Sequence, residues 1–296
     1  RLNAGCIALP LPEGGGRGVG SIRFDRPTVD QICWNDRHQL RRRVHLSLSI
    51  SGLPIPDARE RLTSAAEAAA HAGIPALHLD ATLPGIRPRE LDRSARRDLV
   101  AIAKRHNLSF TGCDLFIPPT HFTSPQHQQR AADAVRQAVV FAAELRTLGA
   151  TAAVVCIETA EPAAKPTEPT VNAASLLTDL VSHARDHGVT LCDCTSDTSP
   201  LARGLDIAAI LARNEDPAAA ILTHKPACLR LADWNGRARV AFGEGRADAA
   251  AIAASASVAA PAALGIFDFR GVRLPDAGSF REAVAAASVC LNEPGA

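Results

Sequence analysis

From residue 44 onward the sequence alternates short apolar segments with longer segments of helical pattern, and this alternation constrains the fold most. The short segments are apolar at successive positions, which is typical of parallel strands covered by helices on both faces. Gly73, Gly149 and Gly188 each stand between a helical segment and the next strand, where a left-handed cap is needed. The expected strands are 44–50, 76–81, 108–116, 151–158, 188–195, 201–207, 227–233 and 264–269. Helices are expected at 58–73, 89–106, 126–148, 172–187, 207–223, 247–258 and 279–291.

Eight such units in about 250 residues predict an α/β fold of the (β/α)8 TIM-barrel type. A doubly wound open sheet is the alternative, but the glycine turn that it carries after its first strand is missing here. Only the residues SDTSP separate Thr195 from Leu201, so the helix after the fifth strand is expected to be absent. Residues 1–42 contain a Gly-rich stretch without a nucleotide-binding pattern, and we expect a partly flexible N-terminal extension there. The barrel is expected over 43–296.

Charge and composition exclude several classes of protein. The chain has 32 basic and 31 acidic residues, a formal net charge of +1, whereas proteins that bind polyphosphate normally show a basic excess. No nucleic-acid partner is therefore expected. The uncharged run 249–267 is rich in Ala and Ser and is interrupted by Pro261, so we expect a helix and a buried strand rather than a membrane span.

The eight cysteines are scattered and form no Cys-x-x-Cys pair. Most of them lie in apolar runs, where thiols are commonly buried, and no signal peptide is visible. Reduced thiols and a cytoplasmic location are therefore expected. The chain begins at Arg1 and contains no Met, so we expect its true start to lie upstream.

Polar residues recur at the ends of the expected strands and in the loops that follow them, where TIM barrels place their chemistry. Each has a plain structural interpretation: Asp80 and Asp206 can cap the next turn, and Asp268 can pair with Arg270 across the mouth. Taken together, acids from so many strands favour a polar pocket, which can hold a hard cation or supply an acid/base pair. The residues are Asp80, Asp114, His121, Glu158, Asp193, Cys194, Asp206, Arg230, Asp233, Glu244, Asp268 and Arg270.

Several segments resemble one family, the xylose-isomerase-like TIM-barrel sugar phosphate isomerase/epimerase superfamily, over residues 44–292. The most telling is the seventh-strand segment, where the family has a strand ending in His-x-x-Asp, a Gly-Glu-Gly loop and a helix Asp. Asp233, the Gly-Glu-Gly of 243–245 and Asp248 match that order. The segments are AGIPALHLDA, CDLFIPPTHF, GVTLCDC, CLRLADWNGRARVAFGEGRAD and LGIFDFRG.

The resemblance implies a divalent metal (Mn, Mg, Co or Zn) held by a Glu on the fifth strand, an Asp near the sixth, a His on the seventh and a Glu on the eighth. Cys194 and Arg230 replace the first Glu and the His, and Asp268 replaces the last Glu. The remaining candidate ligands are Asp206, Asp233 and Asp268. The permanent charge of Arg230 repels a dication at the low dielectric of a pocket, so this metal site is expected to be degenerate.

Two functions compete on these grounds. The resemblance implies a sugar or sugar-phosphate isomerase or epimerase, or a related dehydratase, that acts by acid/base proton transfer at the barrel mouth on a small sugar-derived substrate. The alternative is a diverged, metal-free barrel that binds a small polar or anionic ligand. An AP-endonuclease-like nuclease needs a His-rich zinc cluster and is disfavoured, and no oligomeric state is indicated. The acid/base candidates are Glu158, Asp193 and Asp268; the substrate-binding candidates are Asp80, Asp114, His121, Arg230, Glu244 and Arg270.

Overall fold

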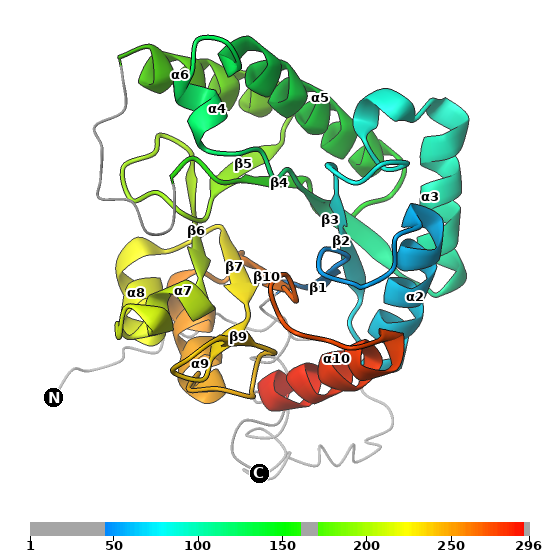
Figure 1. Cartoon of the computed structure of the whole chain (residues 1–296), viewed down its shortest axis with the longest axis vertical. Coiled ribbons are helices and arrows are strands. Elements are labelled where there is room, and N and C mark those ends of the chain that lie inside the picture. The colour runs from blue at the N-terminus through cyan, green and yellow to red at the C-terminus, as the bar shows by residue number, and fades with distance from the viewer. Residues whose placement is uncertain (1–44, 161–170, 293–296) are drawn as a thin grey trace, which may run out of the picture. The chain divides into compact units, whose positions relative to one another are not determined.

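Eight parallel strands close into a barrel in a computed structural model that describes residues 45–160 and 171–292 (Figure 1). All described residues belong to one compact unit, Gln39–Ala296, and the predicted N-terminal extension lies outside them. Around the barrel the strands follow the order β1-β10-β7-β6-β5-β4-β3-β2, which confirms the predicted TIM-barrel fold. The strands are β1 His45–Ser49, β2 Ala76–Asp80, β3 Ser109–Asp114, β4 Val154–Ile157, β5 Thr190–Asp193, β6 Ala202–Asp206, β7 Cys228–Leu231 and β10 Leu264–Phe267.

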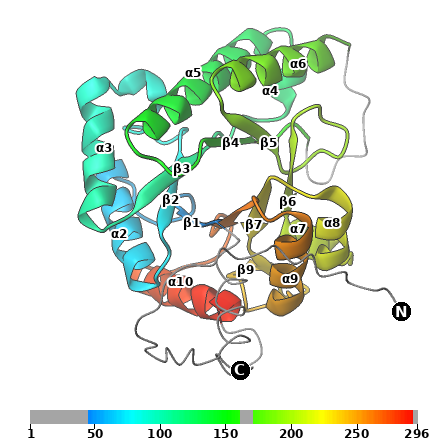
Figure 2. The same cartoon turned by 180° about the vertical axis from the view of Figure 1, so that it is seen from behind.

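Helices surround the barrel and cover the outer faces of the strands (Figures 1 and 2). Aspartates set the starts of many of these helices, because Asp57, Asp92, Asp206, Asp216 and Asp248 each accept a hydrogen bond from a first-turn backbone N–H. The helices are α2 Ala58–His71, η1 Pro88–Glu90, α3 Arg93–Arg105, α4 Thr120–Thr123, α5 Gln128–Thr147, α6 Val171–Asp186, α7 Ile207–Ala212, α8 Pro217–His224, α9 Ala249–Ala259 and α10 Ala277–Asn292.

The unit after β5 lacks its helix, as the short spacing predicts. Between β5 and β6 the chain runs as turns, in which the backbone N–H groups of Thr195 and Ser196 donate to the Asp193 carboxylate. The Asp193 side chain therefore supplies the local acceptors that a helix would otherwise provide.

Several local features differ from the sequence-based expectation. η1 and α3 stand where one helix was expected at 89–106, and α4 was not expected. The single helix expected at 207–223 is two helices, because Asn214 adopts a φ of 57° and Pro217 begins α8. The segment after β7 forms a small antiparallel hairpin, β8 Asp233–Trp234 with β9 Arg239–Val240, which strand periodicity did not reveal because each strand has two residues.

The core has two parts. Apolar side chains between the barrel and the helices form the larger one, and a smaller cluster fills the barrel around Val154, Cys156, Cys192, Cys228 and Ile266. The six described cysteines are free, and four of them are buried. No helix among the described residues is long and apolar enough to cross a membrane, and the uncharged run 249–267 forms α9 and β10.

Candidate functional site

Arg230 is the centre of a buried ion-pair network at the carboxyl ends of the strands. Its Nη1 lies 3.0 Å from Asp268 Oδ2, and its Nη2 donates to Asp114 Oδ1. The three side chains, from β7, β3 and the end of β10, are at most 1% exposed. Burial alone would raise the pKa of Asp114, but Arg230 and then His78 hold it well below its ordinary value. The carboxylates of Asp114 and Asp268 are thus engaged by a permanent cation inside the barrel.

A second guanidinium extends this network toward the rim. Arg239, on the β8–β9 hairpin, places Nη1 2.7 Å from Asp206 Oδ2 and Nη2 3.1 Å from Asp268 Oδ2. Burial works against the charge of Arg239, but Asp206 and Asp268 raise its pKa above the usual value. Asp268 therefore lies between two arginines, and no carboxylate of this network lacks a cationic partner.

Asp233 holds the backbone of the loop that follows β7. Its carboxylate accepts hydrogen bonds from the backbone N–H groups of Trp234, Gly243, Gly245, Arg246 and Ala247 at 2.7–3.2 Å. The side chain is fully buried, and a Cβ at position 245 would lie 2.4 Å from its Oδ1. This carboxylate fixes the loop backbone, so its lone pairs are directed at amides rather than at a shared ligand position.

The carboxylates predicted as metal ligands do not fit a hard dication. Asp206 and Asp268 are paired with arginines, and Asp233 is surrounded by amide donors. Hard cations need several free oxygen ligands around one point, whereas Arg230 and Arg239 place positive charge there. The residues present thus form an internally neutralised network in place of an oxygen cage.

Glu158 and Arg270 form a more accessible pair at the rim. Arg270 Nη2 lies 2.5 Å from Glu158 Oε1, and the side chains are 34% and 19% exposed for Arg270 and Glu158 respectively. The Arg270 guanidinium also stacks over the Phe116 ring, with its Cζ 4.0 Å from the centroid. Because Asp268 Oδ1 accepts from the Arg270 backbone N–H, this pair is continuous with the Arg230 network.

The remaining predicted residues lie in separate surroundings. Asp80 is buried at the end of β2, where burial raises its pKa although Thr82 and Ser51 donate hydrogen bonds to it. Asp193 accepts hydrogen bonds from Thr159 and from the turn after β5. His121 is in α4, with its ring 4.5 Å from that of His127.

Sequence reasoning assigned no role to several polar side chains that the structure brings to the site. His78 is fully buried on β2, with Nδ1 3.0 Å from Thr111 Oγ1 and Nε2 3.4 Å from Asp114 Oδ1. Ser49 and Ser51 both donate to Asp114 Oδ2. Strand alternation could have found them, because His78 and Asp80, like Ser49 and Ser51, are two residues apart and share a strand face.

Three thiols converge inside the barrel beside Arg230. The Sγ atoms of Cys156, Cys194 and Cys228 lie within 4.8 Å of one another, and those of Cys156 and Cys228 are 3.7 Å apart. Hydrogen bonds from the Cys156 and Cys228 thiols, together with Arg230, lower the pKa of Cys194 well below the usual thiol value, against the effect of burial.

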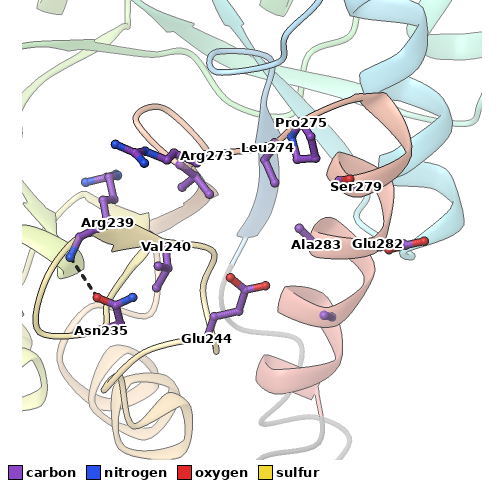
Figure 3. Close-up of a pocket in the computed structure, with 13 residues that line it drawn as sticks. Asn235, Arg239, Val240, Glu244, Arg273, Leu274, Pro275, Ser279, Glu282 and Ala283 are labelled. Atoms are coloured by element: carbon purple, nitrogen blue, oxygen red, sulfur yellow. Dashed lines mark hydrogen bonds between the residues drawn. The ribbon is translucent and has the colours of Figure 1, made fainter.

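A cleft of about 540 Å³ adjoins the network (Figure 3). It lies between the β8–β9 hairpin, the segment 272–275 and α10, and its polar lining includes Asn235, Arg239, Glu244 and Ser279. The Glu244 carboxylate points into the space between the hairpin and α10 (Figure 3). Arg239 connects the two regions, because it lines the cleft and its guanidinium binds Asp206 and Asp268.

Comparison with solved structures defines the class of fold. No family model and no curated protein matches the sequence. A D-allulose 3-epimerase from Methylomonas sp. superposes with a TM-score of 0.61 at 14% identity, covering 85% of this chain and 97% of that one. A xylose isomerase domain protein from Planctomyces limnophilus gives 0.58 at 15% identity, covering 84% and 95%.

A dehydratase shares the same architecture. The probable 3-DHS dehydratase AsbF from Bacillus anthracis gives a TM-score of 0.64 at 11% identity, covering 84% of this chain and 99% of that one. The chain thus has the fold of the xylose isomerase-like TIM barrels, and the low identities mark its sequence as a divergent one.

Proposed function

We propose that this barrel binds a small sugar or sugar-derived ligand at its carboxyl-end mouth, without a dication held by its carboxylates. The observation that carries the proposal is the pairing of Arg230 and Arg239 with Asp114, Asp206 and Asp268. These guanidinium groups neutralise the acids that a hard cation would need. The network therefore forms a fixed polar surface at the carboxyl ends of the strands rather than a metal site.

The chemistry of the rim suits a polyhydroxylated or anionic molecule. Glu158 and Arg270 are partly exposed and offer carboxylate acceptors beside guanidinium donors, and such groups form strong, directional hydrogen bonds with hydroxyl or carboxylate groups. The adjoining cleft has a volume typical of small-molecule sites, and it mixes polar residues with Val240, Val272 and Leu274. Structures with the same fold were crystallised with D-allulose, D-fructose or D-tagatose, which supports a sugar as the ligand class.

Calorimetric titration with D-allulose, D-fructose and D-tagatose tests this proposal. We expect at least one sugar to bind with equal affinity in EDTA and in Mn²⁺. Arg270→Met should weaken that binding about tenfold, the effect of losing one charged hydrogen bond. Arg136→Met, which removes an exposed arginine paired with Asp133 on α5, is the matched control. Binding that requires Mn²⁺, or no binding of any sugar, would contradict the proposal.

Acid/base proton transfer is a second candidate, favoured by two neighbouring carboxyl groups with opposite pKa shifts. Burial raises the pKa of Asp80, whereas Arg230 and His78 overcome burial and lower that of Asp114. The Ser51 hydroxyl lies within 3.4 Å of both carboxylates. Separated pKa values in one site are the usual arrangement for an acid and a base.

This candidate predicts exchange of the carbon-bound hydrogen next to the sugar carbonyl. In D₂O, NMR should show deuterium entering the bound ketose, and Asp80→Asn should slow it, since Asp80 is the carboxyl group of the pair whose pKa is raised. Glu158, Asp193 and Asp268 stay proposals as further acid/base residues. The absence of exchange from every sugar that binds would leave ligand binding as the function.

A further inference from the structure

The three-thiol cluster has the dimensions of a metal site. Cys156 is on β4, Cys194 follows β5 and Cys228 is on β7, so three separate strands hold the thiols in place. Sulfur ligands of a tetrahedral zinc ion lie about 3.8 Å apart, which follows from a Zn–S distance of about 2.3 Å. The Cys156 and Cys228 Sγ atoms already lie 3.7 Å apart, and all three lie within 4.8 Å. A shift of about 1 Å at Cys194 therefore completes the triangle.

His78 provides an independent sign of a ligand at this place. Thr111 Oγ1 donates its proton to the Leu77 carbonyl oxygen at 3.3 Å, so it accepts from the Nδ1–H of His78 at 3.0 Å. His78 Nε2 is buried, makes no hydrogen bond within residues 45–160 and 171–292, and lies 3.4 Å from Asp114 Oδ1. Metal-bound histidines typically have one ring nitrogen fixed by such a hydrogen bond while the other binds the ion.

His78 lies next to one of the three thiols. A ring nitrogen of His78, a carboxylate oxygen of Asp114 and Cys156 Sγ lie within 4.8 Å of one another, so Cys156 belongs to both groups of donors.

We propose that Cys156, Cys194 and Cys228, with His78 as a fourth donor, form a binding site for a soft or borderline cation such as Zn²⁺ inside the barrel. This site uses thiol and imidazole donors rather than the carboxylates of the rim, and it does not depend on the function proposed above. Thiolate and imidazole donors select Zn²⁺ and its heavier relatives over Mg²⁺ or Mn²⁺, which prefer oxygen.

The charges around the cluster are compatible with such an ion. Three thiols that bind a dication as thiolates release their protons, and the resulting complex carries one negative charge. Arg230 lies beside Cys194 and compensates that charge. Cys194 as a residue is partly exposed, whereas Cys156 and Cys228 are buried.

Titration of the reduced, metal-free full chain with Cd²⁺ tests the proposal, because cadmium–thiolate bonds absorb in the ultraviolet. We expect one equivalent to bind with the intensity of three thiolates, and a large excess of Zn²⁺ to compete with it. Cys194→Ala should lose that stoichiometric binding, and circular dichroism checks that the variant is folded. His78→Gln should keep the thiolate absorption and bind Cd²⁺ at least about tenfold more weakly.

Two controls make the result specific. Cys290→Ala removes the other partly exposed thiol, and a Cys6→Ala/Cys33→Ala chain removes the thiols outside the described residues. Both controls should bind Cd²⁺ as the unaltered chain does. The proposal is overturned if the unaltered chain shows no thiolate absorption, if Cys194→Ala keeps it, or if the Cys6/Cys33 control loses it. None of these outcomes changes the sugar titrations in EDTA and Mn²⁺, so the two proposals fail independently.

Discussion

Replacing Arg230 by Met removes the central cation of the buried network and leaves a carboxylate unpaired. Asp268 keeps Arg239 at 3.1 Å, but Asp114 keeps only the Ser49 and Ser51 hydroxyls and His78, which lies 3.4 Å away. Because Arg230 and Asp114 are fully buried, the loss should resemble that of other broken buried pairs, about 3–5 kcal/mol in the free energy of unfolding. Urea unfolding at pH 8, followed by circular dichroism, measures it.

The pH dependence of that loss follows from the same contacts. In the unaltered chain the lowered pKa of Asp114 stabilises the fold above the unfolded-state pKa, and this contribution is lost only as pH falls through the folded-state value. Without Arg230, burial raises the pKa of Asp114, so the penalty is full at high pH and is relieved as the carboxyl takes up a proton. The variant should therefore be less destabilised at pH 5 than at pH 8.

A double variant separates the ion pair from simple packing. Arg230→Met/Asp114→Asn removes both charges and should recover at least half of the lost stability, because no buried charge is left unpaired. Arg136→Met, on an exposed pair, should change stability by less than about 0.5 kcal/mol. Arg230 does not hold a buried Asp114 charge in place if Arg230→Met is as stable as the unaltered chain at pH 8, or if its loss of stability is the same at both pH values.

Three further substitutions test how the fold positions the site. Gly112→Ala should lower the free energy of unfolding in urea by more than about 2 kcal/mol, because φ is 132° and a Cβ would lie 1.8 Å from the Val154 carbonyl oxygen. Gly73→Ala has open space around its Cβ and should lower it by about 1 kcal/mol. Equal losses in the two variants would contradict this. Asp233→Ala should lower the free energy of unfolding by about 2 kcal/mol or more and should speed hydrogen exchange of the loop amides of 243–247. Unchanged exchange would mean that other contacts hold the loop. Asp248→Ala should cost about 1 kcal/mol through loss of the α9 cap, and no loss would exclude the hydrogen bond to the Ala251 N–H as a stabilising contact.

Much of the fold could be predicted because each unit repeats the same pattern. A buried parallel strand needs apolar side chains on both faces, so the eight strands are visible as continuous apolar runs. The missing helix after β5 follows from chain length alone, since the residues between Thr195 and Leu201 are too few to form one. The division of 207–223 into two helices could not be read from periodicity, because the interruption depends on the left-handed backbone of Asn214.

The composition of the site could be predicted better than its pairing. Strand ends placed Asp114, Asp206 and Asp268 at one end of the barrel, and the structure brings them into one network. Arg239 was not assigned to it, because it is 33 residues from Asp206 in the sequence and reaches the site only through the β8–β9 hairpin. Pairing of that kind depends on how a loop folds back, which no local pattern encodes.

The central claim is that arginines, and not a hard dication, hold the carboxylates of the mouth. The most direct test titrates the metal-free chain into Mn²⁺ while recording the electron paramagnetic resonance signal of the free ion. Mn²⁺ prefers oxygen donors and binds thiolates poorly, so it reports on the carboxylates. We expect the signal of free Mn²⁺ to be unchanged by the unaltered chain. Stoichiometric loss of the signal that is abolished by Asp268→Asn would contradict the account.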